Sequence, residues 1–320
     1  MDGWWDCDAV DQFFDRLFRS QVDEHVILNL PAWFLRLVSL VSNRQSLERA
    51  THINRHYNHD ASVFMSFLDP YNQYSCGYFK GTNDLDRAQE QKLELICRKL
   101  DIRPEDRVLD VGCGWGGFAK YAAQHYGCQV TGITISQAQL NHAEEYCKGL
   151  PVTLLKLDYR DLKGEFDKIV VCGMMEHVGY RNYRRFFKVL SGSLRPHGLL
   201  LVQTIGSLVT QTHCDPWFDK YIFPNGLAPS LKQVTTAAER TLVVEDIHNM
   251  GSYYDKTLIA WMERFNENLG HYRETNGERA YRMWKYYFLS MAGAFRSRRM
   301  QLWQVVFSRT GVYGGYASVR

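Results

Sequence analysis

The sequence predicts an α/β protein built on a doubly wound parallel sheet. Short apolar runs alternate with helical segments from about residue 85 onward, and a glycine-rich turn follows the first of these runs. Alternation of strand and helix produces βαβ units, whose parallel strands are covered by helices on both faces. Ligands of such sheets lie at the carboxyl ends of the strands, where a glycine turn lets the backbone approach them.

We expect seven strands, the last of them reached through long helical connections, as in the methyltransferase variant of the doubly wound sheet. The expected strands are 107–111, 129–135, 152–157, 166–172, 198–204, 241–247 and 301–308. The expected helices are 85–100, 117–126, 137–148, 182–194, 254–269 and 277–296. The segment 206–230 is rich in Pro, Gly and aromatic residues and interrupts the alternation.

The first 55 residues are expected to be helical. Apolar residues recur at helical spacing within 8–18, and Pro31 precedes a second helical stretch at 32–41. The apolar tract 26–41 is shorter than a membrane span and contains Arg36, so we do not expect it to cross a bilayer. We interpret residues 1–55 as a partial N-terminal helical domain and 56–320 as the catalytic domain.

Composition excludes several classes of protein. A net charge of +3 over 320 residues gives no argument for nucleic-acid binding. None of the eight cysteines forms a C-x-x-C pair, and the acidic, aromatic start does not resemble a signal peptide. Glu245, His248 and Glu263 lack the spacing of a metal site. We therefore expect a reduced, cytoplasmic protein without a metal.

The glycine turn indicates the cofactor. Residues 108–117 read Val-Leu-Asp-Val-Gly-Cys-Gly-Trp-Gly-Gly, a buried strand that leads into a turn and then a helix. Gly112 and Gly114 allow a sharp bend close to a ligand. The spacing G-x-G-x-G-G, with Asp110 two positions before the first glycine, differs from the dinucleotide fingerprint and is typical of S-adenosylmethionine (SAM) enzymes. We therefore predict a class I SAM-dependent methyltransferase, with the alternative of a structural turn in another Rossmann-like protein.

The end of the second strand carries no acidic residue to bind ribose hydroxyls. Thr134 and the helix residue Gln139 are the polar groups available there.

With these segments joined, the sequence resembles the cyclopropane-fatty-acyl-phospholipid synthases and the related mycolic acid cyclopropane synthases. The resemblance extends over nearly the whole chain, although bacterial synthases carry a longer N-terminal domain. The stretches that carry it are 74–80, 108–117, 132–136, 158–161, 173–179, 215–226, 251–255 and 302–307. It implies the class I methyltransferase fold with helical insertions, SAM as cofactor and an aromatic-lined tunnel for an acyl chain. The implied reaction transfers a methyl group to a cis double bond of a membrane phospholipid, after which a bound bicarbonate ion assists proton removal and ring closure.

The resemblance also implies which residues bind SAM. Tyr74 and Ser75 would contact its methionine part, and Gly112 and Gly114 would form the floor of the site. Thr134, Ile135 and Gln139 would lie on the ribose side. Asp158 and Tyr159 would flank the adenine. A hydroxyl and an amide can bond ribose oxygens, and an aromatic ring can cover a purine.

The catalytic residues implied by the resemblance are Cys76, Glu176, Gln203, Ile205 and Tyr254. Glu176 would orient bicarbonate, Tyr254 would donate to it, and the main chain near Cys76 and Ile205 would add bonds. At Gln203 the family commonly has histidine. An amide can donate a hydrogen bond to an anion, but it cannot carry positive charge or relay a proton. Weaker bicarbonate binding, a changed pH dependence or a changed product is therefore a hypothesis.

Three functions remain open. The first is the phospholipid cyclopropane synthase. The second is a SAM-dependent methyltransferase that gives a methyl-branched or methylenated lipid, or that N-methylates a small amine, as plant alkaloid methyltransferases of similar sequence do. The third is a lipid-binding or scaffold protein, disfavoured because the glycines, Glu176 and Tyr254 are all present. The first implies peripheral contact with phospholipid at the inner membrane face and leaves a homodimer open. The cluster Arg296, Arg298 and Arg299 is interpreted as a solvated helix end rather than a head-group contact.

Overall fold

The computed structural model describes residues 1–21, 61–268 and 272–320, and its core is a seven-stranded sheet. The strand order is β3-β2-β1-β4-β5-β7-β6. The strands are β1 (Arg107–Val111), β2 (Gln129–Thr134), β3 (Val152–Lys156), β4 (Phe166–Cys172), β5 (Leu194–Ser207), β6 (Val243–Asn249) and β7 (Met300–Ser308). β1 to β5 are parallel, and β7 lies antiparallel between β5 and β6. This is the class I methyltransferase sheet, as predicted.

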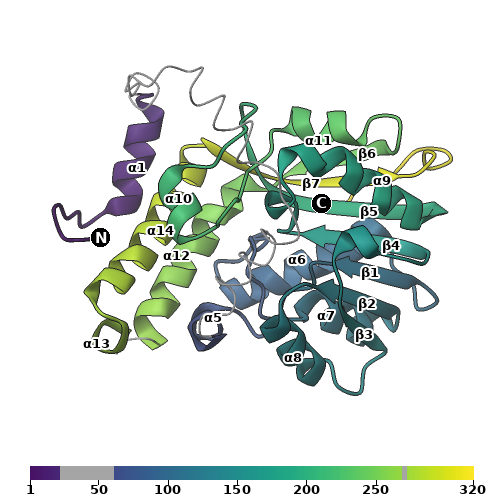
Figure 1. The fold of residues 1–320 in the computed structure, drawn as a ribbon, viewed down its shortest axis with the longest axis horizontal. Coiled ribbons are helices and arrows are strands. Elements are labelled where there is room, and N and C mark those ends of the chain that lie inside the picture. The colour runs from purple at the N-terminus through teal and green to yellow at the C-terminus, as the bar shows by residue number, and fades with distance from the viewer. Residues whose placement is uncertain (22–60, 269–271) are drawn as a thin grey trace.

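Helices cover the sheet on both faces (Figure 1). They are α6 (Leu85–Leu100), α7 (Gly117–Tyr126), α8 (Gln137–Tyr146), α9 (Tyr183–Ser193) and α11 (Leu231–Ala238). Buried strand residues such as Val108 and Val170 pack with α6 and α7, whereas Leu109 and Val171 pack with α9. Adjacent strand residues thus face opposite helical layers, which is why these strands are apolar throughout.

A second helical group lies beyond the strand ends, beside the sheet (Figure 1). It contains α5 (Ala61–Phe67), α10 (Pro216–Tyr221), α12 (Gly251–Asn268), α13 (Tyr272–Asn276) and α14 (Glu278–Arg296). Its interior is aromatic, with Phe67, Trp261 and Phe288 among the fully buried side chains. Of these, α12 and α14 correspond to the helices predicted at 254–269 and 277–296 in the long connection to β7, whereas α5 and α13 were not predicted.

The N-terminal helix α1 (Val10–Arg19) packs along α14. A Cβ on Gly293 of α14 would lie 2.5 Å from the Asp11 carbonyl oxygen, so glycine permits this close approach. Arg296 joins the two segments by donating to Asp11 and, in a paired arrangement, to Asp255. The predicted helix 32–41 lies outside the described residues.

Boundaries differ from the prediction mainly around β5, which begins at Leu194 rather than at residue 198. The short helices α10 and α11 were not predicted, because each occupies the Pro- and Gly-rich stretch or its border. In the part of the chain that the structure describes, no helix combines the length and apolarity needed to cross a membrane.

Candidate active site

The glycine turn after β1 opens a cavity at the carboxyl ends of the strands. Gly112 and Gly114 have φ values of 79° and 54°, a region that side chains with a Cβ rarely adopt. A Cβ on Gly112 would also lie 2.9 Å from the Met174 side chain. The turn is tied to β2, because the amides of Gly112 and Cys113 both donate to the Ile133 carbonyl oxygen. The backbone is therefore held where it can form the floor of a ligand site.

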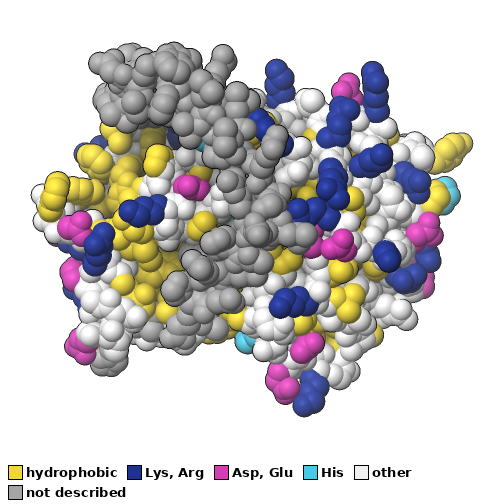
Figure 2. Space-filling model, viewed as in Figure 1, with side chains coloured by type: hydrophobic (Ala, Val, Ile, Leu, Met, Phe, Trp, Pro, Cys, Tyr) yellow, Lys and Arg dark blue, Asp and Glu magenta, His cyan; other side chains and the backbone are white. Residues whose placement is uncertain are grey.

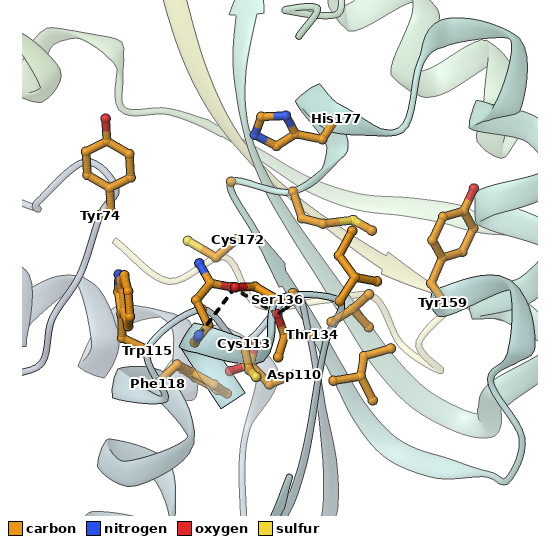
Figure 3. A pocket seen from close by; sticks show the side chains of 18 of the residues that line it. Tyr74, Asp110, Cys113, Trp115, Phe118, Thr134, Ser136, Tyr159, Cys172 and His177 are labelled. Carbon is orange, nitrogen blue, oxygen red and sulfur yellow. Dashed lines mark hydrogen bonds between the residues drawn. The ribbon is translucent and has the colours of Figure 1, made fainter. Parts of the chain in front are cut away.

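All nine residues predicted to bind SAM line this one cavity. They are Tyr74, Ser75, Gly112, Gly114, Thr134, Ile135, Gln139, Asp158 and Tyr159. Figure 3 shows Tyr74 and Tyr159 on opposite sides of the cavity, with Asp110 and Thr134 between them at the strand ends. The four chain segments that carry these residues thus form the wall of one cavity, which we call the SAM cavity.

The polar groups at the end of β2 are fixed by one another. The Thr134 hydroxyl donates to Gln139 Oε1 over 2.9 Å, and the Ser136 amide donates to the Thr134 hydroxyl over 3.2 Å. The Ser136 side chain in turn caps α8 by accepting from the Gln139 amide. Because Thr134 occupies the side-chain oxygen of Gln139, the side-chain NH₂ group of Gln139 is held at the cavity wall as a donor, which suits a ribose hydroxyl.

Asp158 is already engaged by a neighbour. Arg160 donates to both of its carboxylate oxygens over 2.7 Å, and these bonds hold the pKa of Asp158 below its usual value despite burial. A carboxylate has further lone pairs, so an additional donor can still bind. Tyr159 is buried edge-on against Phe186, which fixes its ring in the wall.

The buried carboxyl group of Asp110 bears on whether a cationic ligand suits the cavity. Its Oδ2 is buried and has no hydrogen-bond partner among the described residues. Burial raises the pKa of Asp110 to about 7, an effect that Lys92 partly opposes. A lone buried carboxylate oxygen in a cavity wall is costly unless a donor or cation meets it. The ammonium group of SAM supplies such a partner, so these residues fit SAM.

A second, larger cavity of about 460 Å³ adjoins the first. Tyr74, Ser75, Gly173 and His177 line both, so the cavities meet there. Seven aromatic side chains contribute to its wall: Phe14, Phe18, Tyr74, Phe218, Phe223, Tyr254 and Tyr286. We call it the acyl cavity, after the acyl chain that the sequence resemblance predicts for such a tunnel. Its walls come from α1, the 206–230 segment, α12 and α14, together with residues of β5 and β7, so the helical insertions and the N-terminal helix help to build it.

Four of the five predicted catalytic residues line the acyl cavity. They are Glu176, Gln203, Ile205 and Tyr254. Glu176 Oε1 accepts from the Ile205 amide over 2.7 Å, whereas its Oε2 is buried without a partner among the described residues. Burial raises the pKa of Glu176 to about 7. The carboxyl group is therefore poised to change its charge near neutral pH.

Gln203 is held from the neighbouring strand. Gln304 of β7 donates to Gln203 Oε1 over 2.8 Å, and both side chains are buried. This leaves Gln203 Nε2 buried with no partner in the described structure. Because β5 and β7 pair these two residues directly, Gln304 fixes the orientation of the Gln203 amide.

Cys76 does not line either cavity. Its thiol is fully buried, donates to the Gly77 carbonyl oxygen and contacts the Thr257 hydroxyl. Burial raises the pKa of this thiol above its usual value, so it stays protonated. Any role of Cys76 must therefore come from its main chain, which is the role that the sequence resemblance implies. The hydroxyl of Tyr254 also has a raised pKa through burial and remains a donor.

Two groups in the cavity walls were missed or undervalued in the sequence. His177, which follows Glu176 in the chain, lines both cavities, and burial lowers its pKa to about 4. It is therefore neutral at physiological pH. Trp115 of the glycine turn lines the SAM cavity as well. Of the arginine cluster, Arg296 is a structural link and Arg299 lines the acyl cavity.

The sheet order, the glycine turn and the SAM cavity define a class I SAM-dependent methyltransferase. The chain belongs to the mycolic acid cyclopropane synthetase family, whose model matches residues 44–305.

Similar proteins agree with this assignment. The chain is 47% identical over 325 aligned residues to cyclopropane-fatty-acyl-phospholipid synthase of Escherichia coli (strain K12). The alignment covers 100% of this chain and 84% of the relative. It is 30% identical to tuberculostearic acid methyltransferase UfaA1 of Mycobacterium tuberculosis, over 80% of this chain and 64% of the relative. Mycolic acid cyclopropane synthase CmaA1, solved in complex with SAH and CTAB, superposes with a TM-score of 0.76 at 28% identity, over 81% of this chain and 98% of that one. The chain is accordingly a SAM-dependent methyltransferase of the cyclopropane synthase type.

Proposed function

We propose that the enzyme transfers the methyl group of SAM to the cis double bond of an unsaturated acyl chain in a membrane phospholipid, and that loss of a proton then closes a cyclopropane ring. The observation that carries this proposal is the junction of the two cavities at Tyr74, Ser75, Gly173 and His177. A chain in the long aromatic cavity would present its double bond at this junction. Bound SAM would supply an electrophilic methyl group there.

The aromatic wall suits the charge that this reaction creates. Addition of a methyl group to an alkene leaves a positive charge on the acyl chain. The negative faces of aromatic rings attract cations, and Tyr254 and Phe223 line the acyl cavity beside Glu176. Burial of these rings also keeps water from capturing the cation as an alcohol.

Proton removal is assigned to an anion held by Glu176 and Gln203. Glu176 Oε2 is an unpartnered acceptor, and Gln203 Nε2 is an unpartnered donor in the same wall. Bicarbonate has both a hydroxyl and an anionic oxygen, so it fits this pair, and it would supply a base. Tyr254 would donate a further hydrogen bond, with main-chain groups of Ile205 and Cys76 near it.

An alternative product follows from Gln203, which cannot carry the positive charge of a histidine. A base that is bound more weakly removes the proton more slowly, so the hydrogen on the methyl-bearing carbon can first shift, as hydride, to the cationic carbon. Loss of a methyl proton then leaves a methylenated chain, and a saturated methyl branch requires a further two-electron reduction by a separate hydride donor. The relative from Mycobacterium tuberculosis is named a methyltransferase rather than a cyclopropane synthase, which supports keeping this alternative.

One assay tests the proposal. Purified enzyme is incubated with methyl-labelled SAM and vesicles of unsaturated phospholipid, with and without added bicarbonate, and the fatty acid methyl esters are analysed by mass and by NMR. We expect an added CH₂ unit in a three-membered ring, formed faster with bicarbonate. A labelled branched or exomethylene chain supports the alternative product, and absence of label from lipid, or transfer to a small amine instead, contradicts the proposal.

A further inference from the structure

A lysine without exposed surface lies directly behind the SAM cavity. Lys92 of α6 is 0% exposed. Its Nζ donates to Gln73 Oε1 and, over 3.0 Å, to the Ser75 hydroxyl. Gln73 and Ser75 line the SAM cavity, whereas Lys92 does not. Moving an ammonium group out of water is costly unless hydrogen bonds and opposite charges compensate, so this lysine is retained against an energetic penalty.

The charges around Lys92 belong to the cavity floor and its supporting turn. Burial lowers the pKa of Lys92, and the carboxylates of Asp69 and Asp110 oppose that shift. Lys92 in turn opposes the burial that raises the pKa of Asp110. The ammonium group and the Asp110 carboxyl therefore each favour the charged form of the other.

The same helix fixes the segment that carries Tyr74 and Ser75. Gln89, one turn before Lys92, donates to the Ser75 carbonyl oxygen over 2.8 Å. Asp69 shapes the start of the segment, because its carboxylate accepts from the amides of Tyr71 and Gln73 over 2.8 Å each. The helix thus holds the segment in two ways: Gln89 bonds to its main chain, and Lys92 bonds to the side chains of Gln73 and Ser75.

We propose that Lys92 is a positioning residue for SAM: its ammonium group holds the side chains of Gln73 and Ser75 in place at the cavity wall. It acts through these residues and does not touch the cofactor. The inference rests on the SAM-dependent assignment and not on the lipid substrate, so its failure and the failure of the proposed function can be told apart.

The test is the variant Lys92→Met, assayed for binding of S-adenosylhomocysteine by calorimetry across neutral pH and for steady-state kinetics. We expect affinity to fall about tenfold, the size of one lost charge-assisted hydrogen bond. The KM for SAM rises and the KM for lipid stays within about twofold. In the unaltered enzyme, affinity falls as Asp110 becomes protonated below about pH 7. In the variant that midpoint moves to higher pH, because the neighbouring cation is gone.

Lys99 provides the matched control on the same helix. It is also 0% exposed, but its Nζ lies 3.5 Å from Asp246 Oδ2, away from both cavities. Lys99→Met should alter the melting temperature and leave the affinity and its pH midpoint unchanged. Lys92→Gln keeps a hydrogen-bond donor without charge, so it should recover part of the affinity but not the pH midpoint. The proposal is overturned if a folded Lys92→Met or Lys92→Gln enzyme binds with the affinity and the pH midpoint of the unaltered enzyme.

Discussion

At the scale of single residues, the active site is marked by buried polar atoms that the protein leaves without partners. Glu176 Oε2, Gln203 Nε2 and Asp110 Oδ2 are such atoms in the described part of the chain. Each costs free energy of folding, on the order of 1–3 kcal/mol, that an apolar side chain would not. All three residues line a cavity, so a bound ligand can supply the hydrogen-bond partners that these atoms lack and offset the free-energy cost of burying them.

Glu176→Gln should separate activity from stability. We expect kcat to fall on the order of 100-fold, because an amide cannot serve as the anionic acceptor, with the KM for SAM unchanged. Burial raises the pKa of Glu176 to about 7 from 4.5, so its contribution to stability is present at acid pH and is lost as pH rises through 7. Near pH 8 the variant should therefore be more stable, by up to about 3 kcal/mol.

Denaturant titrations near pH 4 and pH 8 measure this difference. Near pH 4 both side chains are neutral, and the two proteins should unfold at similar denaturant concentrations. A variant that is equally active, or that is destabilised near pH 8, contradicts the role given to Glu176.

Gln203→His should change the bicarbonate dependence that we propose for the enzyme. An imidazole next to Glu176 can carry positive charge, so we expect the bicarbonate concentration at half-maximal rate to fall several-fold and the pH profile to gain a limb near the usual histidine pKa. The measurement is initial rate against bicarbonate at several pH values. If neither activity nor bicarbonate dependence changes, position 203 does not touch the base.

The residue scale also shows what the sequence could predict of the site. Thr134 and Gln139 were recognisable because a strand end followed by a helix start places them together. Lys92 and Gln304 were not, since Lys92 reads as an ordinary helix lysine and Gln304 as a strand residue. Their roles depend on partners far away in sequence, Ser75 and Gln203, which only the folded chain brings near.

At the scale of elements, the strands were predictable because each parallel strand is a short apolar run between helices. The helix α11 had a readable signal that was missed. Ser230 and Gln233 form a capping box, in which each side chain bonds the other's backbone amide. The start of β5 at Leu194 was missed because Pro196 and His197 interrupt its apolar run. The packing of α1 on α14 could not be predicted, because a single glycine within a helix, Gly293, does not reveal which segment approaches it.

Gly293→Val should displace α1 from α14. The new side chain would meet the backbone of Asp11 and Asp15 at under 3 Å, so the helix must move away. Phe14 and Phe18 of α1 line the acyl cavity, and their displacement should raise the KM for lipid several-fold while SAM binding stays intact.

Gly192 of α9 supplies the control for this glycine. A Cβ there meets nothing within 4 Å, so Gly192→Ala should leave kinetics unchanged and stabilise the helix by about 0.5–1 kcal/mol. Paired kinetics and thermal melts of the two variants make the comparison. Unchanged lipid kinetics in Gly293→Val would show that α1 does not shape the acyl cavity.

At the scale of the whole molecule, apolar and basic surface is distributed unevenly. Figure 2 shows hydrophobic side chains gathered at the end where α1, α12 and α14 lie, and Lys and Arg side chains over the end formed by the sheet. Trp4 and Trp5, just before α1, are 93% and 51% exposed, and Leu208 and Val209 after β5 are also exposed. Both segments adjoin residues that line the acyl cavity. An apolar rim at this place suits contact with a lipid surface.

The double variant Trp4→Ala and Trp5→Ala should weaken binding to vesicles of unsaturated phospholipid. Tryptophan favours the membrane interface, so its loss should lower vesicle co-sedimentation and the rate on vesicles several-fold. The rate on the same lipid dispersed in detergent should not change, because neither tryptophan lines the acyl cavity. Tyr313→Ala is the matched control, since Tyr313 is fully exposed and belongs to the segment after β7, which lines neither cavity. If both variants lose vesicle binding equally, or neither does, Trp4 and Trp5 do not form a membrane-binding surface.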